Sequence, residues 1–195
     1  MTNVTLVYFS PNGTTCRTLE YLATGIAPDC RHIDLTSFAA RRQKYSFGPQ
    51  ELVLLGLPVY RGLLPAISEE FFRSLRAERT PAVLLVTYGN RAYDNALLEL
   101  RDKAERAGFA CFAAVAAVAE HAISAEFAGG RPDATDREKL AAYGRLIRNK
   151  FLQQGAGKKV AVPGSYPYER SDIFRTYIIT GENCINCGEC AAGCP

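Results

Sequence analysis

The most constraining feature of the sequence is a regular alternation of short apolar runs with segments of helical periodicity. The runs are almost continuously hydrophobic, as expected for strands that are buried on both faces of a parallel sheet. They are VTLVYF (4–9), ELVLLGLPV (51–59), PAVLLVTY (81–88) and FACFAAVAAVA (109–119), with RHIDL (31–35) as a shorter and more exposed run. This order predicts an α/β fold built on a doubly wound parallel sheet.

Segments of helical periodicity fill the intervals between the runs. We expect helices over residues 14–24, 67–75, 92–107 and 133–154. Gly108 is expected to stop the third of these helices. In the fourth, Thr135 and Glu138 have the spacing of a capping box, which predicts Thr135 as the N-cap. The glycine- and proline-containing stretch after Gln154 is expected to be a linker.

Length and composition limit the remaining possibilities. A chain of 195 residues suits one packed α/β domain with a short appendage. The net charge of +3 is spread along the chain, so nucleic acid is not an expected partner. No apolar run has the roughly 20 residues of a membrane span, and the N-terminus lacks the pattern of a signal peptide. We therefore expect a cytoplasmic protein whose seven cysteines are thiols or metal ligands.

A polar loop, SPNGTT (10–15), follows the first predicted strand and leads directly into a helix. A helix N-terminus offers backbone N–H groups and a partial positive charge, which favour an anion. Gly13 allows a tight turn, and the remaining donors are Ser10, Asn12, Thr14 and Thr15. Both the lysine of a nucleoside-triphosphate loop and the G-x-G-x-x-G pattern are absent from this loop. It therefore predicts a monophosphate held by neutral donors, with an ordinary N-capping turn as the alternative.

Two more loops, PVYRG (58–62) and TYGNRAYDNA (87–96), are expected at the same sheet edge. Tyr60, Tyr88 and Tyr93 are suited to stacking on a flat heteroaromatic ring. Backbone groups of Gly89 and Asn90 are suited to reading the polar edge of such a ring. Each tyrosine alone is better explained as a surface residue, but three loops that converge on one edge favour a ligand site.

The end of the chain carries a cysteine motif, C-x2-C-x2-C-x3-C-P. Its members are Cys184, Cys187, Cys190 and Cys194, followed by Pro195. This spacing is that of bacterial ferredoxins, which bind [4Fe–4S] clusters through thiolates. Zinc is the competing metal, although a four-cysteine zinc site normally has two C-x2-C pairs separated by a longer loop. The motif therefore predicts a 4Fe-4S cluster site.

The chain resembles the bacterial family in which a flavodoxin-like domain is followed by a ferredoxin. The residues that carry the resemblance are SPNGTT, PVYRGLLP, TYGNRAYDNALLEL, AEHAISAEFAGGRPDATD and the cysteine motif. It implies a flavodoxin-like FMN-binding domain over residues 1–165, with sheet order 2-1-3-4-5, and a linker with a partial ferredoxin-type segment over 166–195. Since two-cluster ferredoxins use two cysteine runs, the resemblance also implies truncation within the ferredoxin part. Either Cys194 closes the cluster of Cys184, Cys187 and Cys190 in an unusual geometry, or the cluster is incomplete or absent.

The resemblance assigns FMN to the three loops. The implied cofactor-binding residues are Ser10, Asn12, Gly13, Thr14, Thr15, Pro58, Val59, Tyr60, Gly62, Thr87, Tyr88, Gly89, Asn90, Arg91 and Tyr93. Arg61, Arg91 and His121 are further candidates near the flavin, although a solvated or structural role is at least as good an explanation for each. Flavodoxins that carry electrons are strongly acidic, and this chain departs from them in being slightly basic.

The expected function is electron transfer between a 4Fe-4S cluster and FMN, with a redox protein or a small molecule as the partner. The alternative is an FMN-dependent NAD(P)H:quinone-type reductase, and a third reading is a binding module with a zinc tail. No nucleophile–base arrangement is evident, so no catalytic residue is predicted. Cys111 is expected to be an ordinary buried residue. One hypothesis is that the helix N-terminus lowers the pKa of the Cys16 thiol.

Overall fold

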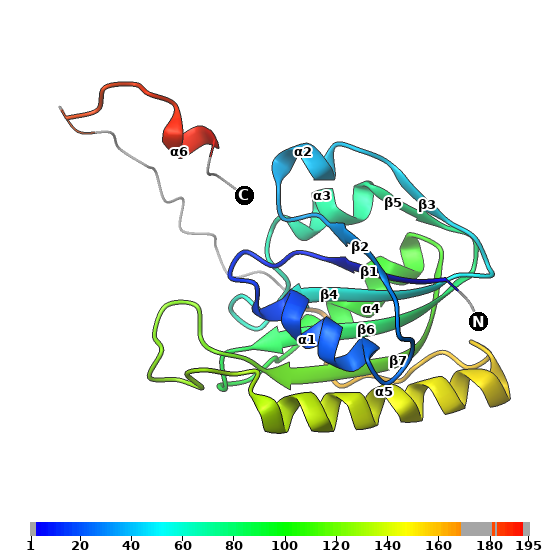
Figure 1. The fold of residues 1–195 in the computed structure, drawn as a ribbon. Helices are drawn as coiled ribbons and strands as arrows, with labels where there is room; N and C mark the ends of the chain where they lie inside the picture. The colour runs from blue at the N-terminus through cyan, green and yellow to red at the C-terminus, as the bar shows by residue number, and fades with distance from the viewer. Residues whose placement is uncertain (1–2, 169–180, 182, 193–195) are drawn as a thin grey trace.

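A computed structural model describes residues 3–168, 181 and 183–192. Its centre is a five-stranded parallel sheet of order β2-β1-β4-β6-β7 (Figure 1). The strands are β1 (Val4–Tyr8), β2 (Arg31–Asp34), β4 (Leu52–Pro58), β6 (Thr80–Tyr88) and β7 (Phe109–Val118). Counted along this sheet alone, the order is 2-1-3-4-5, which confirms the predicted topology.

Helices cover both faces of the sheet, as Figure 1 shows. Helices α1 (Thr14–Ala23) and α5 (Ala134–Gln154) pack on one face, and α3 (Ser68–Arg73) and α4 (Ala96–Arg106) pack on the other. Each face of the sheet has its own hydrophobic core, because successive side chains of a strand point to opposite faces. In β4, Leu52 and Leu54 face α1, while Val53 and Leu55 face α4. Among the described residues, no helix has the length and hydropathy that a membrane span requires.

Some short elements were not predicted from the sequence. They are α2 (Phe38–Arg41), a small parallel sheet of β3 (Tyr45–Phe47) with β5 (Leu75–Ala77), and α6 (Glu189–Ala192). Strands of three residues give too few alternations to be recognised. The expected helix over residues 67–75 therefore ends earlier, at Arg73, and Leu75 opens β5.

Two predicted helix starts differ from the structure. The helix expected from residue 92 begins at Ala96, because Asp94 adopts a positive φ angle that a helix cannot include. The predicted N-cap Thr135 is wrong, and the capping box of α5 is formed by Asp133 and Asp136. The Asp136 backbone N–H donates to Asp133 Oδ1 at 2.9 Å, and Asp136 Oδ2 accepts from the Asp133 N–H at 3.0 Å. Arg131 also donates to this carboxylate, which fixes it in place.

The segment after α5 runs back across the α4 side of the sheet. The Val160 N–H donates to the Cys111 carbonyl at 2.9 Å, and Val160 and Val162 pack against the core on that side. The Ser165 N–H then donates to Asn95 Oδ1 at 2.9 Å, directly before α4. The expected linker is therefore attached to the domain as far as residue 165.

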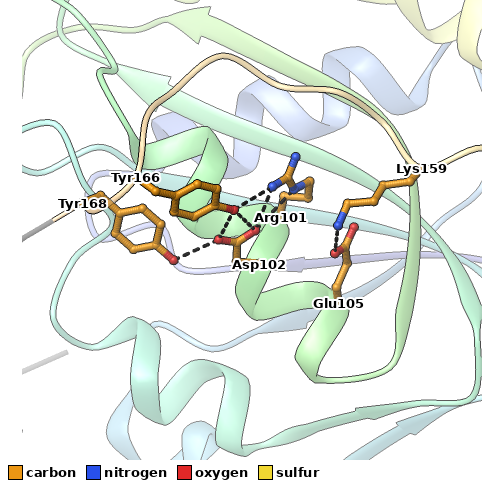
Figure 2. A network of polar contacts seen from close by, with 6 residues as sticks. All are labelled: Arg101, Asp102, Glu105, Lys159, Tyr166 and Tyr168. Atoms are coloured by element: carbon orange, nitrogen blue, oxygen red, sulfur yellow. Dashed lines mark hydrogen bonds and ion pairs between the residues drawn. The ribbon is translucent and has the colours of Figure 1, made fainter.

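Two tyrosines extend this attachment along α4 (Figure 2). The Tyr166 hydroxyl donates to Asp102 at 2.7 Å, and the Tyr168 hydroxyl donates to the same carboxylate at 3.1 Å. Arg101 donates to Asp102 at 3.0 Å from the same helix. Burial alone would raise the pKa of Asp102, but the hydrogen bonds from Tyr166, Arg101 and Tyr168 outweigh it and lower that pKa.

This network predicts a pH-dependent contribution to stability. Because the pKa of Asp102 is lower in the folded chain, its contribution is full above the ordinary pKa near 3.8 and is lost as the pH falls through the folded value. We expect Asp102→Asn to reduce the free energy of unfolding by about 1 kcal/mol at pH 7, and the gap to close below about pH 4. Urea unfolding across this pH range measures both quantities.

The double variant Tyr166→Phe/Tyr168→Phe serves as a companion to Asp102→Asn. It keeps the carboxylate but removes two of its donors, so it should reproduce much of the loss at neutral pH. Stability curves of wild type and Asp102→Asn that stay parallel from pH 3 to pH 7 would contradict the role assigned to this carboxylate.

Candidate functional site

A cavity of about 830 Å³ lies at the carboxyl edge of the central sheet. It is formed by the segments that follow β1, β4, β6 and β7, so the three loops singled out in the sequence do converge. Its size falls within the range of small-molecule and cofactor sites, about 300–1,000 Å³. Parallel α/β sheets bind ligands at this edge, beside the point where the strand order reverses.

The first wall of the cavity is the loop before α1. The first four N–H groups of a helix have no acceptor inside the helix. Ser10 accounts for two of them here, because its carbonyl accepts from Gly13 at 3.1 Å and its Oγ accepts from the Cys16 N–H at 3.0 Å. The other two N–H groups belong to Thr14 and Thr15, which both line the cavity. This wall can therefore bind an anion without a lysine or arginine from the loop.

The Thr15 side chain also makes a contact within the protein. Its Oγ1 lies 2.7 Å from Thr87 Oγ1, and both residues are buried. This hydrogen bond ties the start of α1 to the end of β6. The Thr15 hydroxyl therefore fixes the distance between two walls of the cavity, and its backbone N–H remains the group suited to an anion.

The second wall is a tight turn after β4. Tyr60 pairs with Leu63 through two backbone hydrogen bonds, and Arg61 and Gly62 between them have φ angles of 54° and 80°. A Cβ atom at Gly62 would lie 2.4 Å from Asp94 Oδ2, so only glycine fits at this contact. The turn leaves Tyr60 46% exposed at the cavity, where its ring is accessible to a ligand.

The loop after β6 supports the turn and supplies the third wall. The Asn95 N–H donates to the Gly62 carbonyl at 2.9 Å, and Arg91 forms an ion pair with Asp94. Thr87, Tyr88 and Gly89 line the cavity. The Tyr93 ring instead packs edge-on against Tyr88, with 5.4 Å between ring centroids. Residues 87–89 of this loop therefore line the cavity, and Tyr93 supports Tyr88 from outside it.

The segment after β7 closes the cavity on the remaining side. His121 lies so close to Gly89 that a Cβ atom there would be 2.4 Å from the imidazole Cδ2. The Ile123 N–H donates to His121 Nδ1 at 3.3 Å, which leaves the proton of a neutral imidazole on Nε2. Phe127 packs edge-on against the same ring at 6.0 Å. The histidine is thus held at the cavity as a hydrogen-bond donor.

Most of the predicted site residues line this cavity. They are Ser10, Asn12, Thr14, Thr15, Pro58, Val59, Tyr60, Gly62, Thr87, Tyr88 and Gly89. Four predicted residues, Gly13, Asn90, Arg91 and Tyr93, are not among those that line it.

Several residues that line the cavity were not predicted from the sequence. Arg61 and His121 were only secondary candidates, and Pro11, Leu63, Leu64, Pro65, Ala66, Asp94, Asn95, Ala119, Glu120, Ala122 and Ile123 were not proposed at all. Their common signal is position, since each lies in or beside a segment that follows a strand of the sheet.

The tail cysteines are only partly described. Cys184, Cys187 and Cys190 are exposed thiols, and Cys194 lies outside the described residues. Within the described residues, the group of three potential ligands whose donor atoms lie within 4.8 Å of one another is Cys16, Glu20 and His32, and not the tail. The predicted cluster site at the tail stays a prediction.

The other cysteines can be compared with expectation. Cys111 is buried, as predicted, and burial raises the pKa of its thiol to about 12. The hypothesis of a lowered pKa at Cys16 is wrong. Burial raises the pKa of that thiol and the carboxylate of Glu20 adds to the rise, which the hydrogen bond with Tyr8 only partly offsets.

No protein-family model matches the sequence, and no curated protein matches it. The flavodoxin, WrbA-like protein from Agrobacterium tumefaciens is 18% identical, with a TM-score of 0.53 over 78% of this chain and 99% of its own. An apo NADH:FMN oxidoreductase is 17% identical, with a TM-score of 0.52 over 77% of this chain and 90% of its own.

A larger protein contains the same fold as one of its parts. Rubredoxin oxygen:oxidoreductase from Desulfovibrio gigas is 15% identical, with a TM-score of 0.50 over 77% of this chain and 36% of its own. At these identities the likeness is one of fold. Together with the strand order β2-β1-β4-β6-β7, it shows that this chain has the flavodoxin-like α/β fold.

Proposed function

We propose that the chain is an FMN-dependent redox protein, with FMN bound in the cavity at the carboxyl edge of the sheet. The observation that carries this proposal is that one cavity contains both an anion site made of uncharged donors and an apolar wall. Thr14 and Thr15 offer backbone N–H groups at the N-terminus of α1, and Tyr60 and Tyr88 lie in the same cavity. A monophosphate with an attached aromatic ring system matches both halves.

The residues divide into two sets in this proposal. The phosphate is held by Ser10, Asn12, Thr14 and Thr15, with Gly13 shaping the turn. The ring system lies between the 58–62 turn and residues 87–89. Tyr93 and Arg91 act indirectly, since Tyr93 packs on Tyr88 and Arg91 pairs with Asp94. Asn90 keeps the predicted role of reading the polar edge of the ring through its backbone groups. The flavodoxin and the NADH:FMN oxidoreductase of similar fold are named for flavin chemistry, which supports FMN as the ligand.

FMN supplies one- or two-electron redox chemistry when it is bound, and the chain supplies orientation and environment. Tyr60 is placed to cover one face of the ring system. His121, with its proton on Nε2, is placed to donate a hydrogen bond at the edge. Ile123, which is 92% exposed in the structure, is placed to shield the site from water when a ligand is present.

We further propose that residues 166–195 supply a cluster site that exchanges electrons with the domain, residues 1–165. The support is the C-x2-C-x2-C-x3-C spacing and the exposure of Cys184, Cys187 and Cys190. The attachment of Ser165 to Asn95 adds to it, because Asn95 lines the cavity. The segment that leads to the tail therefore passes the edge of the proposed flavin site at Ser165 before Tyr166 and Tyr168 attach it to Asp102 of α4.

A second candidate function is an FMN-dependent reductase of a small acceptor, such as a quinone. The observation that favours it is charge, because the chain carries +3 where a carrier that docks on basic partners would be acidic. The likeness in fold to an NADH:FMN oxidoreductase is consistent with this alternative.

The test is anaerobic purification, with flavin, iron, sulfide and zinc quantified on the same sample. We expect about one FMN per chain after reconstitution, and a Kd at least 10-fold tighter for FMN than for riboflavin, because riboflavin lacks the phosphate. Iron and sulfide in wild type but not in a variant with Cys184, Cys187, Cys190 and Cys194 replaced by serine would support the cluster.

Kinetics then separate the two functions. Steady NADH or NADPH oxidation with a quinone, unchanged in the serine variant, would favour the reductase. Reduction that requires an external reduced iron–sulfur protein would favour the carrier. A protein that binds neither FMN nor riboflavin after reconstitution would overturn the proposal as a whole.

A further inference from the structure

A second group of chemically active side chains lies between α1 and the edge strand β2, outside the cavity. Cys16 and Glu20 are on α1, and His32 is on β2, the edge strand next to β1. Their ligand atoms all lie within 4.8 Å of one another. None of the three lines the cavity, and the proposed flavin site does not use them.

The fold explains why these residues meet. In the parallel ladder between β1 and β2, Leu6 pairs with His32 and Tyr8 pairs with Asp34, and paired residues point to the same face of a sheet. Leu6 and Tyr8 pack in the core beneath α1, so His32 faces α1 as well. Cys16 and Glu20 are four residues apart and share one side of the helix.

The separations are close to those that a metal ion needs. Tetrahedral zinc has bonds of about 2.0–2.3 Å, which place neighbouring ligand atoms about 3.3–3.8 Å apart. Cys16 Sγ and Glu20 Oε1 already lie 3.7 Å apart. Glu20 and His32 are exposed, so small rotations of their side chains can bring the imidazole nitrogen to the same distance from the other two ligand atoms.

The ligand types select the kind of cation. A thiolate, an imidazole and a carboxylate form the mixed set that zinc accepts, whereas Mg²⁺ and Ca²⁺ prefer oxygen ligands alone. A thiolate and a carboxylate together carry two negative charges, which a divalent cation neutralises. The Tyr8 hydroxyl lies 3.4 Å from His32 Nδ1, where it can hold the orientation of the imidazole.

We propose that Cys16, Glu20 and His32 form a binding site for a borderline divalent cation such as zinc, separate from both the cavity and the tail cysteines. Three protein ligands leave the fourth tetrahedral position open for water or a small molecule, as in zinc sites that exchange ligands. The site does not depend on FMN, so its test uses the flavin-free protein.

The experiment must separate this site from the tail. It uses the untagged full chain under reducing conditions, with Cys184, Cys187, Cys190 and Cys194 replaced by serine. Zinc affinity and stoichiometry are measured by competition with a chromophoric chelator. We expect one zinc per chain, with binding weakened at least about 10-fold by Cys16→Ser and by His32→Gln in this background. The matched control is Cys30→Ser, which removes a half-buried thiol outside the group and should leave the affinity unchanged.

Cobalt provides a second readout that reports the ligand itself. Co²⁺ bound to Cys16 is expected to show a thiolate charge-transfer band, which disappears in Cys16→Ser and remains in Cys30→Ser. Far-ultraviolet circular dichroism verifies that each variant is folded. If Cys16→Ser does not fold, His32→Gln provides the test, because His32 is exposed and its replacement should leave the fold intact. Absence of stoichiometric zinc in the serine background, or zinc affinity unaffected by Cys16→Ser and His32→Gln, would overturn the proposal.

Discussion

Replacing Thr14 with aspartate is expected to weaken FMN binding on the order of 100-fold. Thr14 is the first residue of α1 and lines the cavity, where the proposed phosphate meets the helix N-terminus. A carboxylate there would lie close to the phosphate, and repulsion between like charges at about 4 Å is worth several kcal/mol in a partly solvated site. Titration of the flavin-free protein with FMN, followed by flavin fluorescence, measures the change in Kd.

Two controls make this prediction specific to the phosphate. Riboflavin lacks the phosphate, so its Kd should differ less than about 3-fold between wild type and Thr14→Asp. Thr14→Asn, which has nearly the same shape as the aspartate but no charge, should retain most of the FMN affinity. An acidic residue in the first turn also favours the helix, so loss of the fold does not explain the weaker binding. Equal losses for FMN and riboflavin would show that the phosphate lies elsewhere.

The central sheet was predictable because the sequence repeats one physical pattern. Strands buried on both faces require continuous apolar residues, and β4 and β6 satisfy this rule over almost their whole length. The short strands β3 and β5 were not predictable in this way, because each contributes only three residues. Their pairing depends on a contact between Tyr45 and Leu75, which are distant in the sequence.

The cavity was predictable in outline, and its details depended on tertiary contacts. The loops were found because carboxyl ends of parallel strands share an edge. Which side of a loop faces the ligand is decided by contacts such as Thr15 with Thr87 and Gly62 with Asp94. Tyr93 was predicted to stack on the ligand, but in the structure it packs behind Tyr88, and the sequence cannot distinguish these two positions.

Helices α1 and α5 cross in close contact at Gly144, which leaves no room for a larger residue. A Cβ atom at this position would lie 2.2 Å from the Leu22 carbonyl oxygen and 2.9 Å from Gly25 Cα. Both neighbours are backbone atoms, so no side chain can rotate away. In an exposed helix, Gly→Ala stabilises by about 1 kcal/mol, but here the forced separation of two helices should dominate. We expect Gly144→Ala to lower the free energy of unfolding by about 2 kcal/mol.

Urea unfolding of the flavin-free protein at pH 7 measures this change without a contribution from ligand binding. Leu146→Ala, on the same helix at a residue that is 64% exposed, is the control and should change stability by less than about 0.5 kcal/mol. Gly25→Ala should be destabilising by a similar mechanism, since its Cβ atom would lie 2.1 Å from the Ala141 carbonyl oxygen. Because both substitutions push the same helices apart, the double variant should lose less than the sum of the two single losses. If Gly144→Ala equals or exceeds the wild type in stability, the two helices have room to separate, and their close contact does not hold α1 against the sheet.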